Sequence, residues 1–488
     1  MRFRGPLVES YPSAVVLVLL ALCPYLALTT ASLPLEPLIH RDVGVSETWL
    51  ALTAGLANAA YSFGCVLAAQ LAQKLPGRRL LLLYAVLFVV GSVLAAWTPA
   101  PAAYVAGRIV QGFTTGLMLI AAVPPLVLRW PASKLPRTAV VMNMGIFGAT
   151  ALGPLIGGVA AGADAWRLLS WVVAGLGAAT VLLVLLTFED QEPADLSVRW
   201  DPIGIALCAA ACGSLFFAVS YLPASSLASP AVLVPFVVGA VALLGALVWE
   251  FFSRHALMPI RGLAHTIPVA GISTAMIAGA SSVALIQLAQ TTLQAQGVSP
   301  THAGLLFFPE FGAAIVAAVA FGALFRTRYT PLLALGGLLL LGAGGGVVVA
   351  ATSGPDGLVA IAACLIGLGT GLSVAPALFI SGFSLPSANL PRIFALIELL
   401  RGVAAFLAGP LLLQLAESLG GIAGLRTASW VALALPLAGA AFVLAVFLLG
   451  HGRLQEPDLD AWVDGDEPAV RSAPLLAAAR RSAAVAYE

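Results

Sequence analysis

The chain has 488 residues, of which 60% are hydrophobic and only 9% are charged, and its mean hydropathy is +1.02. About a quarter of the residues of a typical soluble protein are charged, so this composition excludes a soluble globular protein. The formal net charge of +1 gives no bulk attraction to nucleic acid, and we expect no nucleic-acid partner.

Apolar stretches long enough to cross about 30 Å of hydrocarbon recur along the whole chain. Backbone groups in lipid must be satisfied within helices, so the sequence predicts an all-α polytopic membrane protein. The first stretch is as long as the others and lacks a cleavage site, so we interpret it as a span rather than a signal peptide. In chain order the fourteen predicted spans cover residues 12–33, 48–70, 78–98, 101–125, 137–160, 166–188, 202–222, 230–251, 267–291, 302–325, 330–351, 357–380, 391–415 and 427–449.

The loops on the two sides of these spans differ sharply in basic residues. Only Arg41, Arg167 and Arg426 fall on the side opposite the N-terminus. Lys and Arg accumulate in cytoplasmic loops, so we expect both termini in the cytoplasm and the protein in the cell membrane. The N-terminal side carries eighteen basic residues: Arg2, Arg4, Lys74, Arg78, Arg79, Arg129, Lys134, Arg137, Arg199, Arg254, Arg261, Arg326, Arg328, Arg392, Arg453, Arg471, Arg480 and Arg481.

A basic loop occurs at matching points of two halves of the chain. "AQLAQKLPGRRLLLL" joins the second and third spans, and "FGALFRTRYTPLLAL" joins the tenth and eleventh. Internal repeats of this kind are typical of secondary transporters, with the substrate site near the midplane between the halves. We therefore expect a six-helix bundle over 1–200, an inserted helix pair over 201–252 and a second six-helix bundle over 253–450. Residues 451–488 are expected to form a partly disordered, solvated cytoplasmic tail.

Glu310 and Glu398 are acidic residues inside the predicted spans. Glu310 follows Pro309, which removes a backbone donor, so the helix is expected to be locally opened there. An acid within the membrane is a candidate for proton coupling or substrate contact, although it could also stay protonated and only hydrogen-bond a neighbouring helix. Glu398 and Arg401 share one helix face, so they form either a structural ion pair or a switchable one.

Other polar side chains within spans are candidates for lining a mostly hydrophobic cavity or for interhelical hydrogen bonds. These residues are Asn58, Tyr61, Gln111, Asn143 and Gln287. The sequence contains no phosphate-binding loop, metal-ligand cluster or nucleophile constellation, so we expect neither an enzyme nor a cofactor. The cysteines Cys23, Cys65, Cys208, Cys212 and Cys364 all lie in apolar runs and are interpreted as packing residues.

Several motifs together resemble the major facilitator superfamily, and within it the fourteen-span drug:proton antiporters. "LAQKLPGRR" is similar to the family's loop G-x-L-x-D-R-x-G-R-R, "AGRIVQGFTTG" to its fourth-span R-x-x-Q-G, and "ALGPLIGG" to its fifth-span G-P-x-x-G-G. "AWRLLSW", "DPIGIALCAA" and "QGVSPTHAGLLFFP" also resemble family segments, so the resemblance covers nearly the whole chain. It assigns gating and structural roles to Gln73, Lys74, Gly77, Arg78, Arg79, Gly112, Gly153, Pro154, Gly157, Gly158, Arg326 and Arg328.

The chain departs from the family at two acids. Tyr25 stands where the family has a first-span Asp, and Gln73 stands at the Asp of the loop motif, with Pro76 in place of a Gly. The resemblance gives Arg108 a part in proton transfer, but Arg108 must find another partner, such as Gln111, backbone carbonyls or water. We therefore expect that the loop between the second and third spans holds the two halves together through other contacts than in the family. We also expect that proton coupling does not use the two family acids that Tyr25 and Gln73 replace.

The function that the resemblance implies is secondary active efflux of hydrophobic or amphipathic small molecules, by alternating access and in exchange for protons. The expected partners are this small-molecule substrate, protons and the lipid bilayer, and we expect a monomer. One alternative is a substrate-specific exporter or facilitator with altered or no proton coupling. Another is a non-transporting membrane sensor or scaffold.

Overall fold

The computed structural model describes residues 10–188, 199–253, 255–465 and 467–475, and in these ranges all regular elements are helical. Fourteen helical segments are long and apolar enough to cross a membrane, which confirms the predicted number of spans. Arg2, Arg4, Arg254, Arg480 and Arg481, which contribute to the predicted orientation, lie outside the described residues. The chain divides into two compact units, and each is described by itself.

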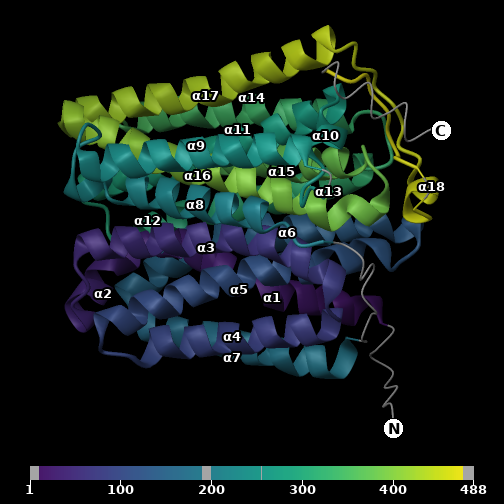
Figure 1. Ribbon diagram of the computed structural model, residues 1–488. Coiled ribbons are helices and arrows are strands. Elements are labelled where there is room, and N and C mark those ends of the chain that lie inside the picture. Colours follow the sequence, from purple (N-terminus) through teal and green to yellow (C-terminus); the bar gives the residue numbers. More distant parts are fainter. Residues whose placement is uncertain (1–9, 189–198, 254, 466, 476–488) are drawn as a thin grey trace. The chain divides into compact units, whose positions relative to one another are not determined.

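The first unit contains residues 1–130, 148–243 and 298–308. In it α3 (Glu47–Lys74) packs against α5 (Pro101–Leu128) and α8 (Pro202–Ser220). The helix α4 (Gly77–Trp97) packs against α5 and α7 (Trp166–Thr187), and α1 (Tyr11–Ala31) also packs against α5 and α7 (Figure 1). The helix α6, Leu135–Gly162, contributes only its second half, and α9, Pro230–Phe252, contributes its first. The shorter elements of this unit are η1 (Leu33–Leu35), α2 (Glu36–Val43), η3 (Leu222–Ala224) and α12 (Pro300–Leu306).

The packing of α3 on α5 depends on glycine. A Cβ on Gly112 would overlap the carbonyl oxygen of Ala57, and one on Gly116 would overlap that of Tyr61. Small residues let the backbones of two membrane helices approach closely, where apolar burial alone gives little attraction. The motif glycine Gly112 therefore holds α5 directly against the backbone of α3.

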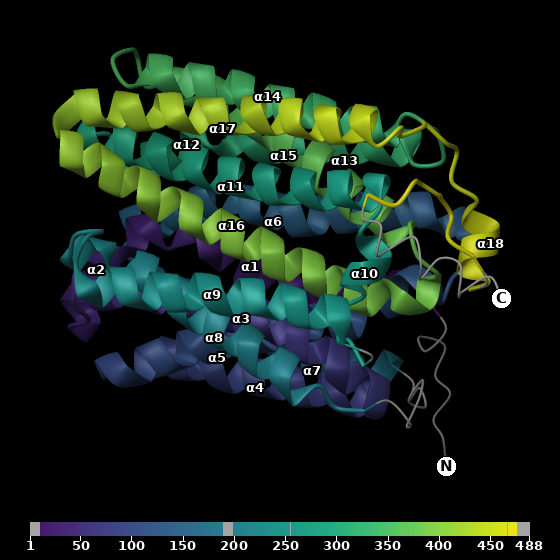
Figure 2. The ribbon, with the colours of Figure 1, turned by 45° about the horizontal axis from the view of Figure 1, so that its top comes forward.

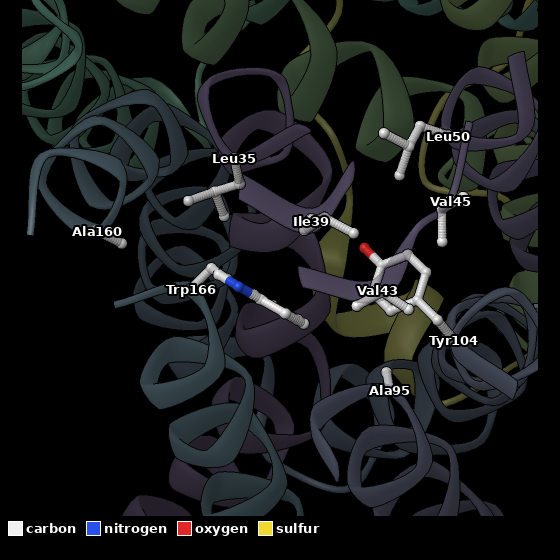
Figure 3. Close-up of a cluster of buried hydrophobic side chains, with 9 residues drawn as sticks. All are labelled: Leu35, Ile39, Val43, Val45, Leu50, Ala95, Tyr104, Ala160 and Trp166. Atoms are coloured by element: carbon white, nitrogen blue, oxygen red, sulfur yellow. The ribbon is translucent and has the colours of Figure 1, made fainter. Parts of the chain in front are cut away.

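The short elements η1 and α2 between the first two spans were not predicted from the sequence. Leu35, Ile39 and Val43 point into a buried cluster with Tyr104 of α5 and Trp166 of α7 (Figure 3). The rings of Tyr104 and Trp166 meet edge to face, with their centroids 6.2 Å apart. The helix α2 is amphipathic and therefore covers the ends of α5 and α7 with its apolar face.

The second unit contains residues 131–147, 244–297 and 309–488. Its helix α11 packs against α14, α15, α16 and α17, and α14 also packs against α15 and α17 (Figure 2). The first half of α6 and the end of α9 belong to this unit. Its other elements are η2 (Ala132–Lys134), α10 (Ile260–Leu263), α11 (Thr266–Ala295), α13 (Phe308–Leu324), α14 (Thr330–Ala351), α15 (Leu358–Gly382), η4 (Ser387–Asn389), α16 (Leu390–Leu419), α17 (Gly421–Leu449) and α18 (Leu459–Val463).

The tenth span consists of two helices rather than one. The helix α12 ends at Leu306, Phe307 forms a turn, and α13 begins at Phe308. Pro309 lies in the first turn of α13, where backbone N–H groups make no hydrogen bond within the helix. The missing N–H of proline therefore costs no helical hydrogen bond there. The sequence predicted an opening near Pro309, and the structure confirms a break two residues before it.

The tail after Gly450 is anchored where the structure describes it, so the expectation of a solvated segment is wrong there. Trp462 of α18 is fully buried, meets Phe383 edge to face at 4.9 Å and donates its indole N–H to the Leu385 carbonyl at 2.9 Å. Val470 donates its backbone N–H to the Phe383 carbonyl at 3.2 Å. The acidic composition suggested exposure, but the buried Trp462 and these hydrogen bonds anchor the segment.

Replacing Gly112 with Ala should destabilise the protein, because the new methyl group has no space against Ala57. Overpacking of this kind costs about 1–3 kcal/mol. The control is Gly175→Ala on α7, where a Cβ meets nothing within 4 Å. Thermal unfolding in detergent should show a lower melting temperature for Gly112→Ala and an unchanged or higher one for Gly175→Ala. Equal melting temperatures would contradict the close-packing account.

Candidate functional site

Arg108 of α5 is held by a chain of polar groups in the first unit. Its guanidinium donates to the Gln111 side-chain oxygen at 2.8 Å, and Gln111 donates to the Ser92 hydroxyl at 2.9 Å. Ser92 in turn donates to the Phe88 carbonyl at 2.7 Å. Gln111 was among the predicted partners of Arg108, whereas Ser92 of α4 was missed because a lone serine in an apolar run carries no distinctive signal.

Tyr25 of α1 faces Arg108 of α5. The Arg108 guanidinium lies 5.9 Å from the centre of the Tyr25 ring, within the range of a cation–π contact. Tyr25 is 1% exposed and stacks on Tyr61 at 6.1 Å, and its hydroxyl has no hydrogen-bond partner among the described residues. The positive charge of Arg108 thus lies beside an aromatic face.

The loop motif between α3 and α4 binds groups of its own unit. Gln73 donates to the Ala69 carbonyl of its own helix at 3.0 Å. Lys74 lies over the Trp200 ring at 5.0 Å, and Arg78 donates to the Leu185 carbonyl at the end of α7 at 2.9 Å. Arg79 is exposed, and Gly77 opens α4. The basic residues of this loop therefore contact an aromatic ring and a helix end, with no carboxylate among these contacts.

The glycines of the fifth span face two neighbours in the first unit. A Cβ on Gly153 or Gly157 would overlap residues of α1, and one on Gly158 would overlap the backbone of α12. Thr30 of α1 donates to the Thr150 carbonyl at 2.6 Å, so this helix pair also has a direct hydrogen bond. Pro154 is buried next to Gly304, whose added Cβ would meet the Pro154 carbonyl at 3.0 Å. The predicted close approach of neighbouring helices is present on two faces of α6, one against α1 and one against α12.

Glu310 lies in the first turn of α13, directly after the helix break. It is 4% exposed, and its Oε2 atom has no hydrogen-bond partner among the described residues. The backbone of Glu310 touches α15, where an added Cβ on Gly367 would overlap the Glu310 carbonyl oxygen. A buried carboxylate without a counter-ion is costly, so this position favours a group that exchanges a proton or receives a ligand.

Other unpaired polar atoms occur near this contact. Asn143 of α6 donates its amide to the Gly371 carbonyl of α15 at 3.0 Å, and its own Oδ1 is buried without a partner. Gly371 lies one turn after Gly367, and the Thr370 hydroxyl is likewise buried and unpaired. The structure thus brings Asn143 and Glu310 to one strip of α15, a juxtaposition that the sequence did not reveal.

Glu398 and Arg401 of α16 form an ion pair. The Arg401 Nη2 atom donates to Oε2 of Glu398 at 2.5 Å, and the Nε atom donates to Oε1 at 3.3 Å. The Arg401 side chain is 16% exposed and the Glu398 side chain 6%. The stem of Arg401 lies against Gly279 of α11, where a Cβ would come within 2.9 Å. The geometry is that of the predicted pair, with two donors matched to two acceptors.

The remaining predicted residues lie apart from these groups. Asn58 donates to the Ala54 carbonyl of its own helix at 2.9 Å. Gln287 of α11 packs on Gly409 of α16, and its side-chain oxygen has no hydrogen-bond partner among the residues that the structure describes. Arg326 is exposed, and Arg328 donates to the Tyr329 hydroxyl at 3.2 Å.

A second set of charges lies at the α2 end of the first unit. The Trp166 indole donates to Asp42 at 2.8 Å, and Arg41 bridges Asp42 and Asp164. Arg41 and the Trp166 indole hold the pKa of Asp42 below its usual range. Burial, and then the nearby charge of Glu47, raise the pKa of Glu36 to about 7. The sequence analysis missed Glu36 because it lies outside the spans.

Among the residues that the structure describes, no group of three His, Cys, Asp or Glu side chains could hold a metal ion. The arrangement instead offers unpaired hydrogen-bonding atoms within apolar helices. Such a site can exchange protons or bind a mostly apolar molecule through a few polar contacts.

Replacing Glu398 with Gln should destabilise the protein, since Arg401 would keep its charge without the carboxylate. Breaking a buried ion pair by removing one partner costs about 3–5 kcal/mol. The double variant Glu398→Gln/Arg401→Gln should recover part of this loss. Thermal unfolding of Glu398→Gln, Arg401→Gln and the double variant checks the coupling. If the double variant loses the sum of the two single losses, the pair is energetically uncoupled.

Stability should also depend on pH through Glu36. Its pKa is about 7 in the folded protein against 4.5 for an exposed carboxyl, so the folded state retains the proton to higher pH. Folding free energy is therefore lost as the pH rises between these two values. Glu36→Gln removes this penalty, so the variant should melt above the wild type at about pH 8 and together with it at about pH 4. The control Glu417→Gln changes an exposed carboxyl, and an equal gain there would contradict the account.

Comparison with known proteins gives the family. Residues 17–289 match the model of the Major Facilitator Superfamily. The chain is 27% identical over 330 residues to the Bacillus subtilis protein named Uncharacterized MFS-type transporter YubD, covering 67% of this chain and 64% of that protein. It is 26% identical over 312 residues to a Multidrug resistance protein B homolog of Mycobacterium tuberculosis, covering 62% and 57%. The matches thus span less than two thirds of each relative.

Solved structures share the fold at low sequence identity. The human organic anion transporter MFSD10 (TETRAN) superimposes with a TM-score of 0.60 at 15% identity, covering 90% of this chain and 100% of that one. The peptide transporter POT superimposes with a TM-score of 0.63 at 15% identity, covering 91% and 97%. The chain has fourteen candidate membrane spans among its described residues, and it belongs to the major facilitator superfamily.

Proposed function

We propose that this transporter exports hydrophobic or amphipathic small molecules in exchange for protons, by alternating access. The observation that carries the proposal is Glu310, a buried carboxyl with an unpaired oxygen at a helix break. Protonation neutralises this side chain, whereas the charged form requires water or a cationic or hydrogen-bonding ligand. One acid of this kind links the binding of a proton to the binding of a substrate.

The nearby chemistry supports a substrate that is mostly apolar. Asn143 and Thr370 offer unpaired oxygen atoms, while their surroundings on α13 and α15 are formed by Ala, Gly and aliphatic residues. A few polar groups in an apolar site fix the orientation of a ligand without demanding one particular compound. Two of the relatives are named as multidrug resistance proteins, which agrees with this substrate class.

The proposal includes the cellular arrangement that the sequence predicts. The protein lies in the cell membrane as a monomer, with both termini in the cytoplasm, where the basic loops gather. Two bundles, over 1–200 and 253–450, flank the inserted pair 201–252, and the tail follows at 451–488.

A second candidate is a substrate-specific exporter or facilitator without proton coupling. It is favoured by Tyr25 beside Arg108 and by Gln73 bonded to its own helix, because neither position supplies a carboxylate. Dissipation of the proton gradient separates the two functions: export by an antiporter stops, whereas downhill movement through a facilitator persists.

Glu310→Gln should abolish pH-gradient-driven export of a lipophilic fluorescent dye from membrane vesicles of a pump-deficient host. The amide is nearly the same size but cannot bind and release a proton. Dye exchange without a gradient should persist, which shows that the variant is folded and binds the dye. Glu417→Gln, on an exposed carboxyl, is the matched control. Undiminished gradient-driven export by Glu310→Gln would exclude this residue as the coupling acid.

A further inference from the structure

An apolar groove lies at one end of the second unit, between α11, α14, α15 and α17. It is lined by Thr274, Leu335, Ile380, Phe447 and other residues that are almost all apolar. The Thr274 hydroxyl is already bonded to the Ala270 carbonyl at 2.8 Å, so it offers the groove little polarity. Leu332 and Leu444 at the rim are 49% and 44% exposed, so the groove opens onto the outer surface of these helices.

The C-terminal tail completes one wall of the groove with Leu454. Two hydrogen bonds join Gln455 to the backbone of Arg471, at 2.8 Å and 3.3 Å. The Thr266 hydroxyl at the start of α11 lies 3.0 Å from the carbonyls of both Gly450 and Ala473. Trp462 is buried against Phe383, so the tail residues 451–465 and 467–475 are fixed on the second unit, and we call them the strap. Leu454 is therefore held in place.

Positive charge gathers where the groove meets this strap. Arg453 precedes Leu454, and Arg328 lies three residues before Pro331, which lines the groove. The Arg328 guanidinium lies over the Tyr329 ring at 5.2 Å, and its pKa is raised by the Tyr329 hydroxyl and by the charge of Glu456 on the strap. Arg326 lies in the same loop, so three arginines lie in the two segments that border this end of the groove, while Glu456, Asp458 and Asp460 follow on the strap.

We propose that this groove binds one anionic phospholipid, with an acyl chain along the apolar lining and the phosphate at Arg328 and Arg453. Basic residues next to the end of membrane helices attract anionic lipids, and an apolar slot beside them holds the hydrocarbon. The end in question carries most of the basic residues of the chain, so the lipid belongs to the predicted cytoplasmic leaflet. The site is separate from Glu310, and its occupation does not depend on proton coupling.

The test uses the full chain in detergent, with phosphatidylglycerol and, separately, phosphatidylcholine. Phosphatidylglycerol should raise the melting temperature more than phosphatidylcholine, and native mass spectrometry should show a single retained molecule. Arg328→Gln and Arg453→Gln should each weaken phosphatidylglycerol binding about fivefold, because each juxtamembrane cation contributes a similar share. Leu335→Trp fills the groove and should abolish retention.

The matched control is Arg137→Gln, which removes an exposed arginine at the start of α6 and should leave binding unchanged. Equal stabilisation by the two lipids, or an equal loss in Arg137→Gln, would overturn the site. Displacement of phosphatidylglycerol by an exported dye would assign the groove to transported molecules and would also overturn it. If Leu335→Trp fails to fold, the two arginine variants decide alone.

Discussion

The structure depends on how charges are accommodated inside helices that face hydrocarbon. An unpaired charge at that depth is expensive, so each ionisable group must be neutralised, paired or used. Arg108 is held by Gln111 and by the face of Tyr25, and Arg401 is paired with Glu398 on the same helix. Glu310 differs from these paired groups, because its Oε2 atom finds no hydrogen-bond partner among the described residues.

The same constraint connects helix packing to the proposed transport. Interhelical attraction in lipid comes from close contact and hydrogen bonds, so glycines such as Gly112 and Gly367 set where helices meet. Gly367 brings α15 against the backbone of Glu310, directly after the break at Phe307. Glu310 therefore lies in the first turn of a new helix, directly after this interruption.

Much of this could be predicted from the sequence, because hydrophobic length and the spacing of basic loops report directly on membrane spans. The pair Glu398 and Arg401 followed from helical spacing, and Gln111 was one of the predicted partners of Arg108. The break at Phe307 was expected near Pro309, but the anchored tail was not, since Trp462 finds its partner Phe383 only through tertiary contacts. The raised pKa of Glu36 depends on its burial in the folded protein, and the contact of Asn143 with Gly371 joins residues far apart in the chain; periodicity reveals neither.

The central claim is that Glu310 links substrate binding to the binding of a proton. Calorimetry of a tightly bound lipophilic dye, repeated in buffers with different ionisation enthalpies, counts the protons that move on binding. The account predicts proton release when the dye binds to the wild type and none when it binds to Glu310→Gln. Equal proton release in the two proteins, or none in either, would contradict it.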